Sequence, residues 1–235
     1  MKLIKTAVSL AILSIGTNAM AANGWKSGVE VGFLLTDGNT ETQSTNIKAS
    51  VEHESDKWRN EAKLEALNVK GKEGRLSEKY LASGKSSFKY SATSYSFITA
   101  DGEHDPFSGF AYQVNSSIGY GYRLIGTDTT TLDLEGGPGY RETRERGADE
   151  AVDEVVIRLS GKYVQKLSKT SAFSEELITA YGEEATITKS VTAVSAQIAG
   201  NLSMKTSFTI KNNTSVPVGV KATDKETAVT LVYTF

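Results

Sequence analysis

Apolar and polar residues alternate with a period of two along most of the chain that follows the first 21 residues. The clearest run lies within 110–124, where Tyr112, Val114, Ile118 and Tyr120 share one face and the positions between them carry glutamine, asparagine, serine and glycine. Successive side chains of a β-strand point to opposite faces, whereas an amphipathic helix repeats its apolar positions every three to four residues. The alternation therefore predicts strands and argues against helices.

The same pattern predicts about twelve strands, separated by polar turns. Their expected ranges are 25–35, 42–54, 58–69, 78–89, 94–101, 110–124, 129–140, 154–167, 170–181, 189–202, 205–213 and a last strand that ends at Phe235. The strands at 94–101 and 170–181 are the least regular. The predicted fold class is all-β.

The links between these strands differ in length according to their order. The even-numbered links are short, at 55–57, 90–93, 125–128, 168–169 and 203–204. Apart from the first, 37–40, the odd-numbered links are longer, at 70–77, 102–109, 141–153, 182–188 and 214–222. An antiparallel up-and-down barrel in an outer membrane has short periplasmic turns and longer outer loops. The sorting of the links predicts such a barrel, with an even number of strands and both termini on the periplasmic side.

The first 21 residues have a different character. Lys2 and Lys5 precede a short apolar run, which ends in the small-residue triplet Ala19-Met20-Ala21. This arrangement is typical of a secretory signal peptide that is cleaved after Ala21, and the apolar run is too short for a membrane anchor. We therefore expect a signal peptide at 1–21 and a barrel at 22–235. Removal of the signal takes away two lysines and changes the net charge from −2 to −4.

Aromatic residues and the last strand support a membrane location. Five aromatic residues lie near strand ends on the apolar face, as in an interfacial girdle: Trp25, Trp58, Tyr122, Tyr163 and Tyr233. The last strand resembles the signal that the barrel assembly machinery reads, with Val229, Leu231, Tyr233 and Phe235 on one face. A barrel closes all its backbone hydrogen bonds within lipid, so an outer-membrane location is expected.

The polar face of the predicted strands carries charges of both signs. On a membrane barrel these side chains point inward, because a Lys or Arg facing lipid would cost about 2–4 kcal/mol at the midplane. The candidate lumen-lining residues are Lys48, Glu52, Arg59, Glu61, Lys63, Glu65, Lys79, Lys85, Arg123, Asp133, Glu135, Arg158 and Lys162. A barrel of this size encloses either a narrow pore or a plug of paired charges. A narrow channel for small solutes or ions and a non-conducting structural barrel both remain open.

Residue types that support catalysis or metal binding are sparse. The pair His53 and Ser55 superficially resembles the His-x-Ser of outer-membrane phospholipases, but it flanks a predicted periplasmic turn, so we expect no catalytic residues. His104 in an outer loop and the acidic run from Asp149 to Glu154 lack ordered ligand spacing. The glycines of 136–139 are expected to relieve crowding or to bend a strand, because no lysine or helix follows them as in a phosphate loop.

The composition narrows the range of expected binding partners. The chain has no cysteine and a net charge of −2, which gives no indication of disulfides or nucleic-acid binding. No cofactor and no metal is expected. The expected partners are outer-membrane lipid and lipopolysaccharide, with the barrel assembly machinery during biogenesis. A soluble periplasmic β-protein and an outer-membrane lipid hydrolase are the less favoured alternatives.

Two segments resemble a known family. The first is Asp37-Gly38-Asn39-Thr40 after the Trp25 strand, and the second runs from Asp133 through Gly136-Gly137-Pro138-Gly139 to Arg141. Together they resemble the salt-induced outer-membrane protein family (YdiY-like), over essentially the whole mature chain. The resemblance implies an outer-membrane barrel of unknown function, in a setting of salt or osmotic stress, and it supplies no catalytic residues.

Overall fold

A computed structural model describes residues 24–36, 42–71, 74–105 and 110–235 of the chain. The expected signal peptide, 1–21, lies outside the described residues, as does the 37–40 motif. The described residues form twelve strands. These are β1 (Trp25–Thr36), β2 (Thr42–Glu54), β3 (Trp58–Gly71), β4 (Gly74–Lys89), β5 (Ser94–His104), β6 (Phe110–Gly126), β7 (Thr130–Glu145), β8 (Val152–Lys166), β9 (Ser171–Gly182), β10 (Thr186–Ala199), β11 (Leu202–Asn213) and β12 (Thr223–Thr234).

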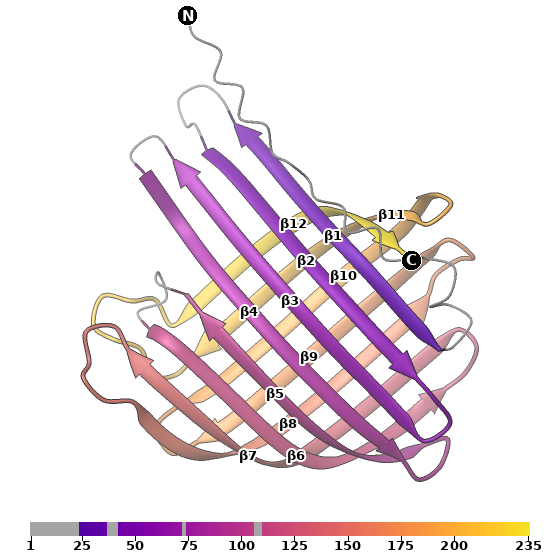
Figure 1. Ribbon diagram of the computed structural model, residues 1–235, viewed down its shortest axis with the longest axis horizontal. Coiled ribbons are helices and arrows are strands. Elements are labelled where there is room, and N and C mark those ends of the chain that lie inside the picture. The colour runs from indigo at the N-terminus through magenta and orange to yellow at the C-terminus, as the bar shows by residue number, and fades with distance from the viewer. Residues whose placement is uncertain (1–23, 37–41, 72–73, 106–109) are drawn as a thin grey trace, which may run out of the picture.

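Each strand pairs with its neighbours in sequence, and β1 pairs with β12, so the sheet closes into an antiparallel barrel (Figure 1). The predicted fold and strand count are confirmed. The amide of Phe235 donates to the carbonyl of Ser27 at 2.8 Å, which ties the last residue to the first strand. Among the described residues, no helix is long and apolar enough to cross a membrane.

The predicted outer links were too long in several places. β3 continues to Gly71 and β4 begins at Gly74, so most of the expected link 70–77 is strand. β7 likewise extends to Glu145, and β5 extends to His104, which pairs with Tyr80 of β4. Beyond the lipid, both faces of a strand can be polar. The alternation of apolar and polar residues therefore ends before the backbone pairing does, and the sequence pattern underestimates the length of these strands.

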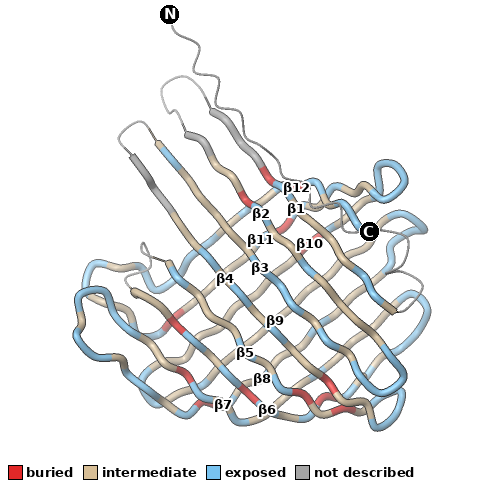
Figure 2. Tube along the Cα trace, in the orientation of Figure 1, coloured by how far each residue is buried: buried red, intermediate tan, exposed pale blue. Residues whose placement is uncertain are grey.

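The distribution of burial is the reverse of that in a water-soluble domain (Figure 2). Among the described residues, the only buried hydrophobic ones are Tyr95, Phe97, Val156 and Ala193, and buried polar or charged residues outnumber them. Large apolar side chains such as Leu64, Ile118 and Val155 are exposed on the outside, at 60–72% of their surface. A continuous apolar exterior is a membrane surface. This exterior excludes the soluble alternative.

Aromatic side chains mark both ends of the apolar belt. The five residues expected in a girdle lie near the ends of strands beside the short turns. Trp25 contacts His53 and Trp58 contacts Phe88, with ring centroids 4.5 Å and 5.0 Å apart. At the opposite end of the strands, Tyr80 and Tyr140 are also exposed. These two levels bound the lipid-facing part of the barrel.

The irregular strand β9 carries a carboxylate on its outer face. Glu175 has the same parity as the exposed Leu177 and Tyr181, so it faces outward. The hydroxyls of Ser190 and Thr192 on β10 donate to its carboxylate oxygens at 2.6 Å and 2.5 Å. Its Cα partner on β8 is Tyr163 of the girdle, so this acid lies near the interface, where polar groups cost less.

Glycines of β6 and β7 permit a close approach of the two strands and of side chains in the lumen. A Cβ on Gly137 would lie 2.1 Å from the carbonyl oxygen of Ile118, and one on Gly139 would lie 2.3 Å from Oγ of Ser117. The expectation that the 136–139 glycines relieve crowding is met at these two positions. On β6, a Cβ on Gly119 would meet both the Gly136 carbonyl oxygen, at 2.3 Å, and the Phe97 ring.

Candidate functional site: the charged lumen

The thirteen candidate lumen residues lie on strands β2 to β8, and their positions alternate with those of the exposed apolar residues. On β3, for example, Arg59, Glu61 and Lys63 alternate with Trp58 and the exposed Leu64. Eleven of the thirteen are half-buried, while Lys63 and Lys162 are exposed. The structure joins several of them by ion pairs in one group, and a second group of charges, outside the thirteen, lies at a different depth.

The first group centres on Glu135 of β7, in the half of the lumen that lies beside the short turns. Its carboxylate binds the ammonium of Lys85 on β4 and accepts a hydrogen bond from the hydroxyl of Tyr95 on β5 at 2.8 Å. Arg158 of β8 lies 3.3 Å from the other carboxylate oxygen. Lys85 and Glu135 come from strands that are not neighbours in the barrel. Their contact therefore crosses part of the lumen rather than running along the wall.

A second carboxylate extends this group towards the end of the barrel that carries the short turns. Asp133 of β7 binds Arg123 on the adjacent β6 through two hydrogen bonds of 2.7 Å and 2.9 Å, a bidentate geometry. It also lies 3.9 Å from Arg59 of β3, which in turn binds Glu54 at 2.9 Å. Lys89 donates to the same Glu54 at 2.8 Å. Two adjacent clusters therefore bring together charged side chains from six strands, β2, β3, β4, β6, β7 and β8.

Two aromatic rings form the floor of this group. Tyr95 and Phe97 of β5 point inward and are 6% and 2% exposed. They fit against the wall of β6 because Gly119 and Gly121 leave room for the rings. The ammonium of Lys85 lies 5.2 Å from the Phe97 ring centroid, and the Arg158 guanidinium carbon lies 5.6 Å from it. The rings thus support the two cations that hold Glu135.

The second group lies nearer the end with the longer links and spans the whole lumen. The ammonium of Lys211 on β11 lies 2.8 Å from the carboxylate of Glu103 on β5. In the closed order of twelve strands, β5 and β11 are on opposite sides. The cavity beside the pair has a volume of about 20 Å³, which is room for about one water molecule. The pair therefore bridges the lumen at this level.

A third ion pair is the most enclosed in the described part of the chain. Arg141 of β7 is 1% exposed, and it binds Glu154 of β8 at 2.6 Å and the backbone carbonyl of Ala185. Arg141 had been expected in the link 141–153, and Glu154 at the start of the next strand. The expectation for Arg141 was wrong, because β7 continues to Glu145 and Arg141 lies within it.

Sequence reasoning missed several charges of the lumen. The ion-paired residues outside the thirteen candidates are Lys26, Glu30, Glu54, Lys89, Glu103, Arg141, Glu154, Lys205 and Lys211. All of them have the parity of the polar face of their strand, and that signal could have found them. The sequence contained no signal for which strand each residue would reach across the lumen.

The positions considered for catalysis or metal binding have other roles in the structure. The Ser55 hydroxyl exchanges hydrogen bonds with the backbone of Trp58, at 3.2 Å and 3.3 Å, and shapes the turn. His53 faces outward against Trp25. His104 was expected in a loop but lies at the end of β5, where its Nδ1 donates to the carbonyl of Ala111 at 2.5 Å. Within the described ranges, no group of three His, Cys, Asp or Glu residues could hold a metal ion.

Known structures with a similar fold include a porin and an outer-membrane channel. The NanC porin matches with a TM-score of 0.56 at 10% identity, covering 88% of this chain and 98% of that one. An outer-membrane channel from Pseudomonas putida F1 matches with a TM-score of 0.50 at 12% identity, covering 90% and 94%. With its apolar exterior and charged interior, the protein is an outer-membrane β-barrel, as predicted.

The sequence comparisons define the family. Residues 29–235 match the family described as "Protein of unknown function, DUF481", and the chain belongs to this family. The uncharacterized protein YdiY of Escherichia coli (strain K12) is 25% identical over 222 residues, which cover 92% of this chain and 85% of that protein. The YdiY-like resemblance seen in the sequence is confirmed.

Proposed function

We propose that the protein is a narrow outer-membrane channel for small solutes or ions, and that ion pairs across the lumen close it. The observation that carries this proposal is the Lys211–Glu103 pair, which joins opposite walls through two flexible side chains. Side-chain rotations alone would break the contact, and no strand would have to move. Water at the mouth can solvate the separated charges, so the cost of opening is small compared with that of a dry ion pair.

The thirteen candidate residues are the lining of this proposed channel. Ions that enter would exchange contacts with charges of both signs. High salt would weaken the pairs by screening, which is in keeping with a role under salt or osmotic stress. We propose no catalytic step.

Lipopolysaccharide is the proposed neighbour of the outer loops, with the barrel assembly machinery a transient partner that reads the strand ending at Phe235. A slower rate of membrane assembly in F235A would test the latter.

The second candidate function is a non-conducting structural barrel. The specific observation in its favour is the density of contacts across the lumen, since Lys85–Glu135 and Lys211–Glu103 cross it at two depths. In this case the paired charges would act as a permanent plug, and the protein would stabilise the envelope.

Single-channel recording in a planar bilayer distinguishes the channel from the non-conducting structural barrel. We expect conductance steps from the refolded protein and larger steps from E103Q and K211Q, because each substitution releases the cross-lumen contact. E103Q should shift the ion preference towards anions, and K211Q towards cations. The control is K225Q, which removes an exposed lysine of β12 whose parity is that of the outer face. Silent bilayers from all variants, with folding shown by heat-dependent gel mobility, would leave only the structural barrel.

A further inference from the structure

The seam between the first and the last strand is much shorter than the other strand pairings of the barrel. Residues 28–31 of β1 pair with residues 231–234 of β12, and the pairing goes no further. In contrast, β1 pairs with β2 along 25–36, and β12 pairs with β11 along 223–233. Within the described strands, the second half of β1 and most of β12 therefore each have one edge that no strand covers.

The two edges separate towards the end of the barrel with the longer links. Figure 1 shows that β1 ends at the top of the view, whereas β12 starts at the left, well away from it. Gly32 marks the last close approach, because a Cβ added there would lie 3.0 Å from Cγ2 of Thr230 and 3.2 Å from the carbonyl oxygen of Val229. We call the stretch beyond it, between 33–36 of β1 and 223–229 of β12, the unpaired seam.

The backbone groups along the unpaired seam need hydrogen-bond partners. Lipid offers none, so an open sheet edge cannot face the hydrocarbon of a membrane. Unpaired backbone at membrane depth is tolerated where it lines a water-filled cavity. Water from the lumen can reach both edges, because they lie in the wall of the barrel. The unpaired seam is therefore expected to be a hydrated opening in the side of the barrel.

The outward side chains of β12 change character where the pairing stops. Val229 and Leu231, at the paired end, are apolar and exposed. Thr223, Lys225 and Thr227 have the same outward parity along the unpaired seam, and they are polar and exposed. The lipid-facing band of a membrane barrel is apolar. This change along one strand indicates contact with water or polar groups beside the unpaired seam.

A buried amide without a partner lies beside the point where the strands separate. Asn46 of β2 is the Cα partner of Gly32, and it is 6% exposed. Neither its amide nitrogen nor its amide oxygen has a hydrogen-bond partner in the part of the chain that the structure describes. A buried polar group without a partner is costly. Water or a polar group that enters between β1 and β12 can supply these hydrogen bonds, which favours further opening at this point.

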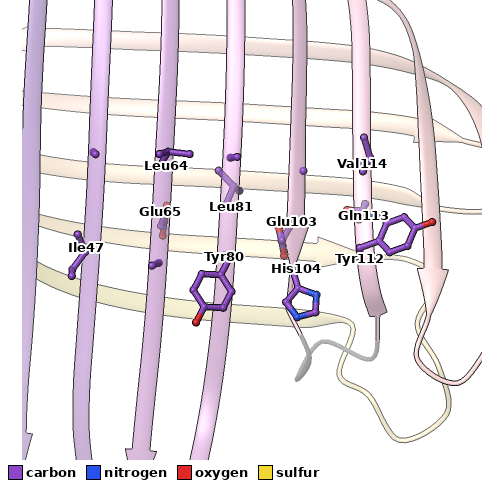
Figure 3. A pocket seen from close by; sticks show the side chains of 14 residues that line it. Ile47, Leu64, Glu65, Tyr80, Leu81, Glu103, His104, Tyr112, Gln113 and Val114 are labelled. Carbon is purple, nitrogen blue, oxygen red and sulfur yellow. The ribbon is translucent and has the colours of Figure 1, made fainter.

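The hollow on the outer face of β2 to β6 is a different feature (Figure 3). Ile47, Leu64 and Val114 line it and are apolar and exposed. The strands beneath them pair with one another across the whole hollow. Lipid chains can cover such a surface without any loss of backbone hydrogen bonds, so this hollow does not join the lumen to lipid.

We propose that the unpaired seam is a lateral opening through which amphipathic molecules pass between the lumen and the outer leaflet. The opening joins a charged interior to an apolar exterior at one level of the barrel. The polar part of such a molecule stays in the lumen, where Asp224 and Glu226 of β12 have inward parity, while its apolar part enters the lipid. The choice of leaflet rests on the proposed orientation, and the opening is independent of whether the lumen conducts ions.

Disulfide formation tests whether the seam is unpaired. If the register of β1 with β12 continued, it would bring Leu34 opposite Ala228, so the variant L34C/A228C reports on this position. The matched control, G28C/T234C, lies in the paired part of the same seam. Cysteines whose Cα atoms are more than about 7 Å apart cannot bridge. We expect the control to oxidise and L34C/A228C to stay reduced, and equal oxidation would overturn the opening.

Fluorescence quenching tests whether the opening joins the lumen to lipid. A bimane label on A228C, with inward parity beside the unpaired seam, is compared with one on S83C of β4, which is paired on both sides. The vesicles contain phosphatidylcholine with a nitroxide on the acyl chain. We expect quenching at A228C close to that of the lipid-facing L231C, and little at S83C.

Equal, weak quenching at A228C and S83C would overturn lateral access. Neither assay measures conductance, so a failure of this inference is distinguishable from a failure of the channel proposal.

Discussion

G119A is expected to destabilise the barrel by about 3 kcal/mol or more, the upper end for overpacking a tight site. The added methyl would lie 2.3 Å from the Gly136 carbonyl oxygen and 2.8 Å from the Phe97 ring. The first of these is backbone of the adjacent strand, which cannot rotate away. The second belongs to a ring that is 2% exposed and is covered by Lys85 and Arg158.

Urea unfolding in detergent micelles, followed by tryptophan fluorescence, measures this effect. The matched control is G28A, since Gly28 occupies a strand position on the polar face of β1 and its nearest neighbour to an added Cβ is 3.5 Å away. That substitution should change stability by less than about 1 kcal/mol. If G119A unfolds at the same urea concentration as G28A, the close packing of β6, β7 and the Phe97 ring is incorrect.

The second large effect is expected at the enclosed pair of Arg141 and Glu154. R141M should destabilise the barrel by about 3–5 kcal/mol, because it leaves a buried carboxylate without its partner. The side chains of the pair are only 1% and 9% exposed, so little water can compensate. The Ala185 carbonyl would also lose its donor.

The double variant R141M/E154M distinguishes the contribution of the ion pair to stability from that of side-chain packing. Replacing both charges with residues of similar size removes the unpaired carboxylate, and most of the lost stability should return. Unfolding midpoints of the two single variants and the double variant complete the cycle. Additive losses in the double variant would show that the two residues do not interact, which would contradict the inward placement of Arg141.

The barrel could be predicted because its environment imposes a period of two. Lipid on one side and charge on the other sort the positions of β6 so clearly that Tyr112 to Tyr122 define their own face. The ends of strands were less predictable. Towards the ends beside the longer links, outward-facing positions such as His104 and Glu142 are polar, so the positions of Glu103 and Arg141 looked like loop although the backbone stays paired.

The contacts of the lumen could not be predicted for a different reason. Glu103 and Lys211 meet because the number of strands places β5 opposite β11, and the sequence pattern of either strand contains no trace of that geometry. The same holds for the fit of Tyr95 and Phe97 against the glycines of β6. The glycines suggested a need for space, but only the folded barrel shows which rings use it.

Whether the Lys211–Glu103 contact gates the lumen can be measured most directly by cross-linking. The chain has no cysteine, so E103C/K211C introduces the only two thiols. A reducible bis-methanethiosulfonate linker of about ion-pair length would then join β5 to β11 across the lumen. We predict that conductance of the double variant is abolished by the linker and restored by reductant, while E103C alone is little affected. A linked protein that conducts as before would contradict closure of the channel by this contact.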